Sequence, residues 1–203
     1  IDNVVLAGTL TFPKEGNKFP AVVMISGSGG QDRNEEILGH KPFLVISDYL
    51  TKNGIAVLRY DDRGIGESTG DFRSATSEDF AKDALAAVDY LKTKNEINRI
   101  GIAGHSEGGL IAPIVAVQSD DVDFIVLMAG TGLRGDSILM LQSELIMRAN
   151  GESEENIQRD LKIYRNIYNE ILSGKSDEEL KESLTSILNE AYELLPEKER
   201  QEA

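Results

Sequence analysis

Residues 101–109 read Gly-Ile-Ala-Gly-His-Ser-Glu-Gly-Gly, so that Ser106 lies between Gly104 and Gly108 directly after a short apolar run. A tight turn from a strand into a helix holds such a serine in a strained backbone conformation, and only very small residues two positions away avoid a clash. The apolar run before it and the helix-forming residues 109–117 after it supply that setting. The stretch therefore predicts a strand–turn–helix unit with Ser106 at the exposed tip.

Short apolar runs like the one before Ser106 recur along the first 130 residues. They occupy residues 21–25, 55–58, 100–103 and 124–128. Runs of this length suit central strands of a parallel sheet, which are covered on both faces. Helical patterns over residues 42–53 and 77–92 separate them, and alternation over residues 6–12 predicts one further, half-buried strand. Strands alternating with helices predict an α/β fold with right-handed crossovers.

The composition changes after Gly130, because few glycines follow it and no apolar run there resembles a strand. Three helical patterns occupy residues 136–149, 154–172 and 177–195. Ser176 and Glu179 have the spacing of a capping box for the third helix. We expect residues 1–130 to form part of an α/β core, and residues 131–203 to form an all-helical segment whose apolar stripes are covered by helix packing.

The charge balance and the composition exclude several classes of protein. There are 21 Lys and Arg residues against 35 Asp and Glu residues, a net charge of −14, so we set nucleic-acid binding aside. No apolar run approaches the ~20 residues that span a bilayer, so we expect a soluble chain. The absence of cysteine excludes a thiolate nucleophile and a cysteine metal site. The first residue is Ile1 rather than methionine, which leaves open both a cytoplasmic protein and one exported after removal of an upstream segment.

The predicted turn at Ser106 has the features of a nucleophilic serine. A serine hydroxyl attacks a carbonyl group when a neighbouring base takes its proton. The helix after the turn directs its first N–H groups toward the site, so the N–H of Glu107 can donate to a developing oxyanion. A second donor is expected from residues 26–30, where we favour Ser28 and keep Gly29 as the alternative. A structural turn at Ser106 and a merely flexible glycine loop are the competing interpretations.

Nucleotide-binding motifs are incomplete in this chain. Asp32 stands where the third glycine of a dinucleotide fingerprint would follow Gly27 and Gly29. Asn169 stands where a phosphate-binding loop ending at Ser176 would have its leading glycine. No metal or organic cofactor is implied.

Three stretches of the chain carry a resemblance to a known family. They read VVMISGSGGQDRNE (residues 22–35), IAVLRYDDRGIGESTG (55–70) and IGIAGHSEGGLIAP (100–113). In this order and spacing they resemble the α/β-hydrolase superfamily, in particular bacterial esterases of the serine hydrolase type with a helical cap. The resemblance implies a mostly parallel sheet with an antiparallel N-terminal strand in residues 1–130, and a cap or lid in residues 131–203.

The resemblance assigns a structural loop, rather than a catalytic role, to residues 61–68. The positions that match the family's fingerprint are Arg63, Gly64, Gly66 and Ser68. We give Asp61 and Asp62 the same structural role. One position departs from the pattern, because many relatives have histidine before the first glycine of the oxyanion loop, and Ser26 stands there.

A base for Ser106 is missing from the chain. In the family resembled, the acid and then the histidine follow the nucleophile, but no histidine follows Ser106 here. We expect His105 to point away from the tip of the turn, and we interpret His40 as a surface or loop histidine. The leading explanation is that the chain is an N-terminal portion of a longer enzyme, whose last strands, acid and histidine lie beyond it. Completion of the site by another chain and a degenerate homologue stay open.

These features together predict a serine hydrolase that cleaves a carboxylic ester through an acyl-enzyme on Ser106, and a chain that is inactive without the missing residues. A thioesterase or peptidase of the same fold stays open, and a non-catalytic binding protein is the alternative from a different class. The expected ligand is a small ester or acyl compound, with Leu139, Met140 and Leu145 as candidates for an apolar lining in the cap. An unpaired sheet edge at residues 124–128 predicts self-association.

Overall fold

The computed structural model of the chain describes residues 3–195 and 200. The chain divides into two compact units, Ile1–Gly132 and Leu133–Ala203. The last part of the helical segment predicted over residues 131–203 lies outside the described residues, which leave out 196–199 and 201–203.

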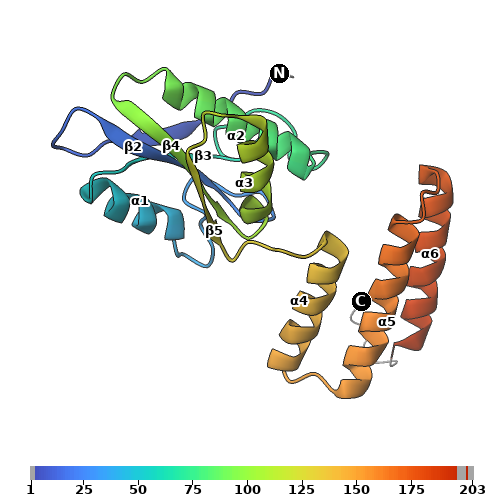
Figure 1. The fold of residues 1–203 in the computed structure, drawn as a ribbon. Helices are drawn as coiled ribbons and strands as arrows, with labels where there is room; N and C mark the ends of the chain where they lie inside the picture. Colours follow the sequence, from blue (N-terminus) through green and yellow to red (C-terminus); the bar gives the residue numbers. More distant parts are fainter. Residues whose placement is uncertain (1–2, 196–199, 201–203) are drawn as a thin grey trace. The chain divides into compact units, whose positions relative to one another are not determined.

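The first unit is built on a five-stranded sheet with the strand order β1-β3-β2-β4-β5 (Figure 1). Its strands are β1 (Gly8–Thr11), β2 (Phe19–Ile25), β3 (Ala56–Tyr60), β4 (Ile97–His105) and β5 (Phe124–Met128). β1 runs antiparallel to β3, and all other neighbouring strands are parallel. The mostly parallel sheet with an antiparallel N-terminal strand, predicted from the sequence, is confirmed.

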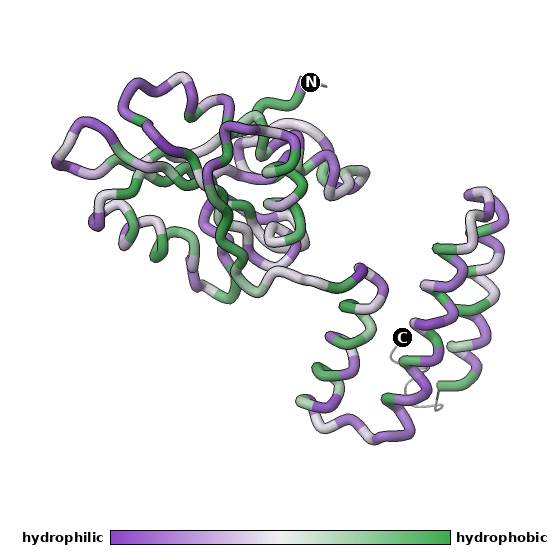
Figure 2. Tube along the Cα trace, viewed as in Figure 1, coloured by the Kyte–Doolittle hydropathy of each residue, from purple (hydrophilic) through white to green (hydrophobic). Residues whose placement is uncertain are grey.

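Helices cover both faces of this sheet. They are α1 (Pro42–Lys52), α2 (Ser77–Lys92) and α3 (Glu107–Gln118). α1 lies on one face, where Phe43 shares a cluster with Val22 and Val57, and α2 and α3 lie together on the other face (Figure 1). On that second face, Val88 of α2 and Ile111 of α3 belong to the larger cluster of the core. Burial on both faces explains why the central strands read as continuous apolar runs, which Figure 2 shows along the chain.

The strands differ from the predicted apolar runs at their ends. β4 begins at Ile97, before its apolar run, because Ile97 and Arg99 pair with Phe19 and Pro20 of β2. β1 is shorter than the predicted alternating run, because the N–H of Ala7 donates to the hydroxyl of Ser68 (2.9 Å) in a loop rather than to a strand. The partners of a segment, as well as its hydropathy, therefore set where a strand ends.

Within the described residues, the second unit consists of the helices α4 (Gly135–Ala149), α5 (Glu154–Ile171) and α6 (Asp177–Leu194). The capping box at the start of α6 is confirmed. The hydroxyl oxygen of Ser176 accepts from the N–H of Glu179, and a carboxylate oxygen of Glu179 accepts from the N–H of Ser176 (3.0 Å). α5 contacts both α4 and α6.

The apolar stripes of these helices are less covered than predicted. Ile157 and Leu161 of α5 are buried, but Ile171 at the end of the same stripe is 50% exposed, and Leu188 of α6 is 56% exposed. The expectation of covered stripes is wrong at these two positions. A single layer of three helices offers too few neighbours to cover every apolar side chain of its members.

Candidate active site

The turn between β4 and α3 holds Ser106 in a strained conformation. Its φ is 51° and its ψ is −110°, in a region that residues other than glycine rarely adopt. The N–H of Ser106 donates to the carbonyl oxygen of Met128 at the end of β5 (2.9 Å). This hydrogen bond ties the turn to the edge of the sheet and fixes the point from which the serine side chain projects.

The glycines on either side of Ser106 lie where two backbone segments almost touch. A Cβ atom on Gly104 would overlap the carbonyl group of Gly108 and would lie 2.7 Å from the nitrogen of Gly109. A Cβ atom on Gly108 would lie 2.6 Å from the carbonyl oxygen of Ser26. The two glycines therefore let the start of α3 pack directly on β4 and on the loop after β2.

The loop after β2, residues 26–31, lies beside Ser106. A Cβ atom on Gly27 would lie 3.2 Å from Cβ of Ser106. The N–H of Gly27 donates to Oε1 of Glu35, and the N–H of Gln31 donates to Oδ2 of Asp62, each at 2.9 Å. The N–H groups of residues 28–30, which lie between Gly27 and Gln31, donate no hydrogen bond to any of the residues that the structure describes.

Unpaired N–H groups thus come from two elements beside the turn. The loop contributes those of Ser28 and Gly29, and α3 contributes that of Glu107, its first residue, which has no acceptor within the helix. The carboxylate of Glu107 accepts from the hydroxyl of Ser77 at the start of α2 (2.7 Å). Neutral donors of this kind, at a helix start and in a glycine-rich loop, suit an anion formed next to Ser106.

The two histidines have different surroundings. Nδ1 of His105 lies 2.7 Å from Oε1 of Glu35, a buried carboxylate whose backbone has a φ of 52°. His40 is exposed, and its backbone pairs with that of Ile37 in the segment before α1. Glu35 could not be recognised from the sequence, because its partner His105 is 70 residues away along the chain.

The loop that begins at Asp61 is fastened to its surroundings by charged groups. Asp61 accepts from Nε of Arg33 (2.9 Å) and from the N–H of Glu67 (3.0 Å). Burial opposes ionisation of Asp61, but hydrogen bonds, that of Arg33 first among them, lower its pKa to about 2. Nε of Arg63 pairs with Oδ2 of Asp83 in α2 (2.7 Å). These contacts support the structural role that the resemblance implies for this loop.

The remaining fingerprint positions shape the same loop. Gly64 and Gly66 have φ values of 72° and 56°, and a Cβ atom on Gly66 would lie 2.5 Å from Oδ2 of Asp61. The hydroxyl of Ser68 donates to the carbonyl oxygen of Asp61 (2.7 Å). Glycine is needed at both positions because side chains are strained at such φ values.

Asp62 is the buried carboxylate at the other end of the loop after β2. Burial raises its pKa to about 6, although hydrogen bonds from the N–H of Gln31 and the hydroxyl of Ser26 oppose the rise. Ser26, which stands where many relatives have histidine, thus donates to Asp62 (2.9 Å). A pocket of about 10 Å³, lined in part by Gly27, Asp62 and Glu107, has room for one water molecule at most.

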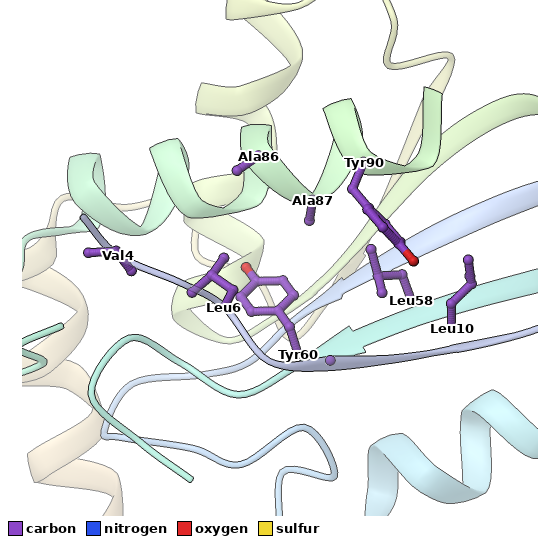
Figure 3. Close-up of a pocket in the computed structure, with 9 residues that line it drawn as sticks. Val4, Leu6, Leu10, Leu58, Tyr60, Ala86, Ala87 and Tyr90 are labelled. Carbon is purple, nitrogen blue, oxygen red and sulfur yellow. The ribbon is translucent and has the colours of Figure 1, made fainter. Parts of the chain in front are cut away.

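A larger cavity of about 390 Å³ lies between β1, β3 and α2 (Figure 3). It is lined by Val4, Leu6, Gly8, Leu10, Leu58, Tyr60, Ala86, Ala87 and Tyr90. None of these residues belongs to the turn at Ser106 or to the loop beside it. This cavity is therefore separate from the candidate active site.

Residues 3–195 and 200 lack two features. None of the helices there is long and apolar enough to cross a membrane. In the same part of the chain, no three His, Asp or Glu side chains are grouped so that they could hold a metal ion.

Comparison with known proteins gives relatives over much of the chain. A family model described as serine aminopeptidase, S33 matches residues 42–175. The esterase EstD of Thermotoga maritima is 35% identical over 162 residues, which cover 77% of this chain and 39% of EstD. An acyl transferase of Shewanella woodyi is 30% identical over 121 residues, which cover 59% of this chain and 37% of that protein.

A solved structure agrees with these relatives. Est1E from Butyrivibrio proteoclasticus with bound ferulic acid superposes with a TM-score of 0.54 at 32% identity, over 61% of this chain and 48% of that one. The chain spans less than half the length of these relatives, at 39% and 37% of the two curated proteins. Residues 42–175, which the family model matches, contain the turn at Ser106.

Proposed function

The chain belongs to the serine aminopeptidase S33 family of α/β hydrolases, and on this premise we propose that it carries the nucleophile of a serine hydrolase that cleaves carboxylic esters. Ser106 is the nucleophile. The N–H groups of Ser28 and Glu107 are the oxyanion donors, with Gly29 as the alternative to Ser28. The helical segment predicted over residues 131–203 is the cap.

One observation supports this proposal above the others. The strained turn holds Ser106 beside the N–H groups of Ser28, Gly29 and Glu107, which have no acceptor among the described residues. Backbone strain is costly in a structural turn, and N–H groups that are free to donate are useful where a tetrahedral intermediate forms.

The reaction proceeds in two halves. The hydroxyl oxygen of Ser106 forms a bond to the ester carbonyl carbon while a base takes its proton, and the carbonyl oxygen becomes an oxyanion. The N–H groups of Ser28 and Glu107 donate to that oxyanion, each worth about 3 kcal/mol in the transition state. The alcohol leaves with a proton from the protonated base, and water then releases the acid from Ser106.

The base is the part of the proposal that this chain does not supply. No histidine follows Ser106 in the sequence, and His105 is engaged through Nδ1 with Glu35. We propose that an acid and a histidine outside these residues complete the site, so that the 203-residue chain alone turns over model esters at a rate ~10⁴-fold or more below that of the full-length protein.

The relatives favour an ester over a peptide as the substrate. EstD, 35% identical to the chain over the matched residues, is an esterase by name, and Est1E, 32% identical, was solved with ferulic acid bound. The family description names an aminopeptidase, so an aminoacyl p-nitroanilide is the comparison substrate. We expect p-nitrophenyl esters to be cleaved with a higher kcat/KM than this amide.

The experiment that tests the proposal is labelling of the full-length protein with a fluorophosphonate, followed by mass spectrometry. We expect one adduct, on Ser106, and none in Ser106→Ala. Ser137→Ala, a change at an exposed serine at the start of α4, is the matched control and should label like the wild type. Equal labelling of Ser106→Ala and the wild type would contradict the proposal.

A further inference from the structure

Two buried carboxylates hold the two ends of the loop after β2. Glu35 accepts from the N–H of Gly27, and Asp62 accepts from the N–H of Gln31 and from the hydroxyl of Ser26, each at 2.9 Å. Glu35 is 6% exposed and Asp62 is 7% exposed. The N–H groups between the held ends are the ones that donate to no other described residue. The N–H groups without an acceptor thus lie between those of Gly27 and Gln31, which each have a carboxylate as acceptor.

A single oxygen atom of Glu35 serves two parts of the site. Its Oε1 accepts from the N–H of Gly27 and lies 2.7 Å from Nδ1 of His105, the residue before Ser106. A Cβ atom on Gly27 would lie 3.3 Å from that same Nδ1 and 3.2 Å from Cβ of Ser106. The spacing between the loop and the turn therefore depends on where this oxygen lies.

A negative charge on Glu35 is by itself unfavourable at this position. A carboxylate near a developing oxyanion opposes it by like-charge repulsion, and burial of an ionised carboxylate is costly unless hydrogen bonds satisfy it. Glu35 also has a φ of 52°, a conformation in which side chains are strained. Strain of this kind persists where the surroundings fix a residue firmly, and it is common at functional sites.

We infer that Glu35 is a positioning residue: its carboxylate orients Gly27 and His105 so that the unpaired N–H groups of the loop face the oxyanion formed at Ser106. The inference rests on the proposed function. Asp62 holds both ends of the loop through its own two hydrogen bonds. Neither carboxylate touches the reacting atoms. Because the role needs an oxygen acceptor at the right reach and not a negative charge, glutamine at position 35 fulfils it.

Steady-state kinetics of the full-length protein with a p-nitrophenyl ester test this role. We expect Glu35→Ala to lower kcat 10- to 100-fold while KM changes less than about threefold, since the loop no longer holds its donors at the transition state. Glu35→Gln should stay within about threefold of the wild type. Glu36→Ala is the matched control, because Glu36 is the exposed neighbour, paired with Lys41 (3.2 Å), and should leave both constants unchanged.

Two results would overturn the inference. The first is a kcat of Glu35→Ala equal to that of the wild type. The second is a loss of kcat in Glu35→Gln as large as in Glu35→Ala, because it would assign the role to the charge and point to Glu35 and His105 as a base. If Glu35→Ala does not fold, Glu35→Asp replaces it, since aspartate keeps the buried charge but shortens the reach. We expect at least a 10-fold lower kcat there, and an unchanged kcat overturns the inference.

Fluorophosphonate labelling distinguishes a failure of the proposed function from a failure of the positioning role. Labelling that does not require Ser106 refutes the proposed function itself. Labelling that requires Ser106, together with unchanged kinetics of Glu35→Ala, refutes the positioning role alone.

Discussion

Arg63 and Asp83 are joined by two short contacts, from Nε to Oδ2 at 2.7 Å and from Nη2 to Oδ1 at 2.8 Å, and both side chains are nearly buried. The pair fastens the loop after β3 to α2, and Nη2 of Arg63 also donates to the carbonyl oxygen of Asp79 (2.9 Å). The same loop contains Asp62, so the pair also stabilises the part of the chain that places Asp62 in the candidate active site.

Removal of one partner of this pair should be strongly destabilising. Asp83→Ala leaves the Arg63 guanidinium in a poorly solvated place, and we expect the free energy of unfolding to fall by about 3–5 kcal/mol. Asp48→Ala breaks the exposed pair with Lys52 and should cost about 0–1 kcal/mol. Urea unfolding followed by circular dichroism measures both variants, and equal losses would show that burial of the pair is unimportant.

The backbone contact at Gly104 predicts that alanine is not tolerated there. The added Cβ would meet backbone atoms of Gly108 and Gly109, which cannot move without displacing the start of α3. We expect Gly104→Ala to lower the free energy of unfolding by about 3 kcal/mol and to abolish labelling of Ser106. Gly132→Ala is the control, because its added Cβ has no atom within 4 Å. Normal labelling of Gly104→Ala would mean that the turn adapts.

The raised pKa of Asp62 predicts a pH dependence of stability. Burial raises this pKa from 3.8 to about 6, with smaller contributions from the charges of Asp83 and Glu107. Between these two values the folded chain holds a proton that the unfolded chain has lost, so the contribution of Asp62 to stability falls as the pH rises through that window. The rise corresponds to about 2–3 kcal/mol.

Asp62→Asn removes this titration. Relative to the wild type, the variant should therefore gain about 2–3 kcal/mol of unfolding free energy between pH 4 and pH 7, whatever constant cost the lost acceptor adds. Urea unfolding at the two pH values measures the difference. Asp48→Asn, on the surface of α1, should show no such change. A parallel pH dependence of Asp62→Asn and the wild type would mean that Asp62 titrates normally.

The edge of the sheet predicts self-association of the 203-residue chain. β5 is the last strand in the sheet order, and Val126 and Leu127 on it are about half exposed. An unpaired strand with apolar side chains accepts a strand from a second copy. Light scattering should give a mass above 22.2 kDa that rises with concentration. Leu127→Lys should lower it and Leu188→Lys should not, whereas a constant monomer mass would contradict the prediction.

Local signals in the sequence located most of the fold. α2 and β5 have the predicted bounds, because a helical pattern covers residues 77–92 and β5 is a short apolar run. The same signals missed the end of β3, where Arg59 is a buried strand residue although the apolar run stops at Leu58. A charged side chain in a strand is recognised as buried only when its partner is known, and Nη1 of Arg59 donates to the side chain of Asn34.

Ser106 could be predicted from the sequence, but the residues that position the loop beside it could not. The G-x-S-x-G spacing is local, so the turn could be found by reading along the chain. Glu35 lies in a polar stretch with no periodicity, and its contacts with Gly27 and His105 arise only when the loop after β2 folds against the turn after β4. A positive φ at a glutamate has no signal in the sequence either.

The division of the chain after Gly132 has a consequence for protein engineering. The turn at Ser106, the loop beside it, both buried carboxylates and the Met128 carbonyl that anchors the serine all precede that point. A gene fusion at this joint would exchange the helical segment for that of another family member without altering a single residue of the nucleophilic centre. Chimeras of this kind would show whether substrate preference follows the exchanged helical segment while reactivity follows the first unit.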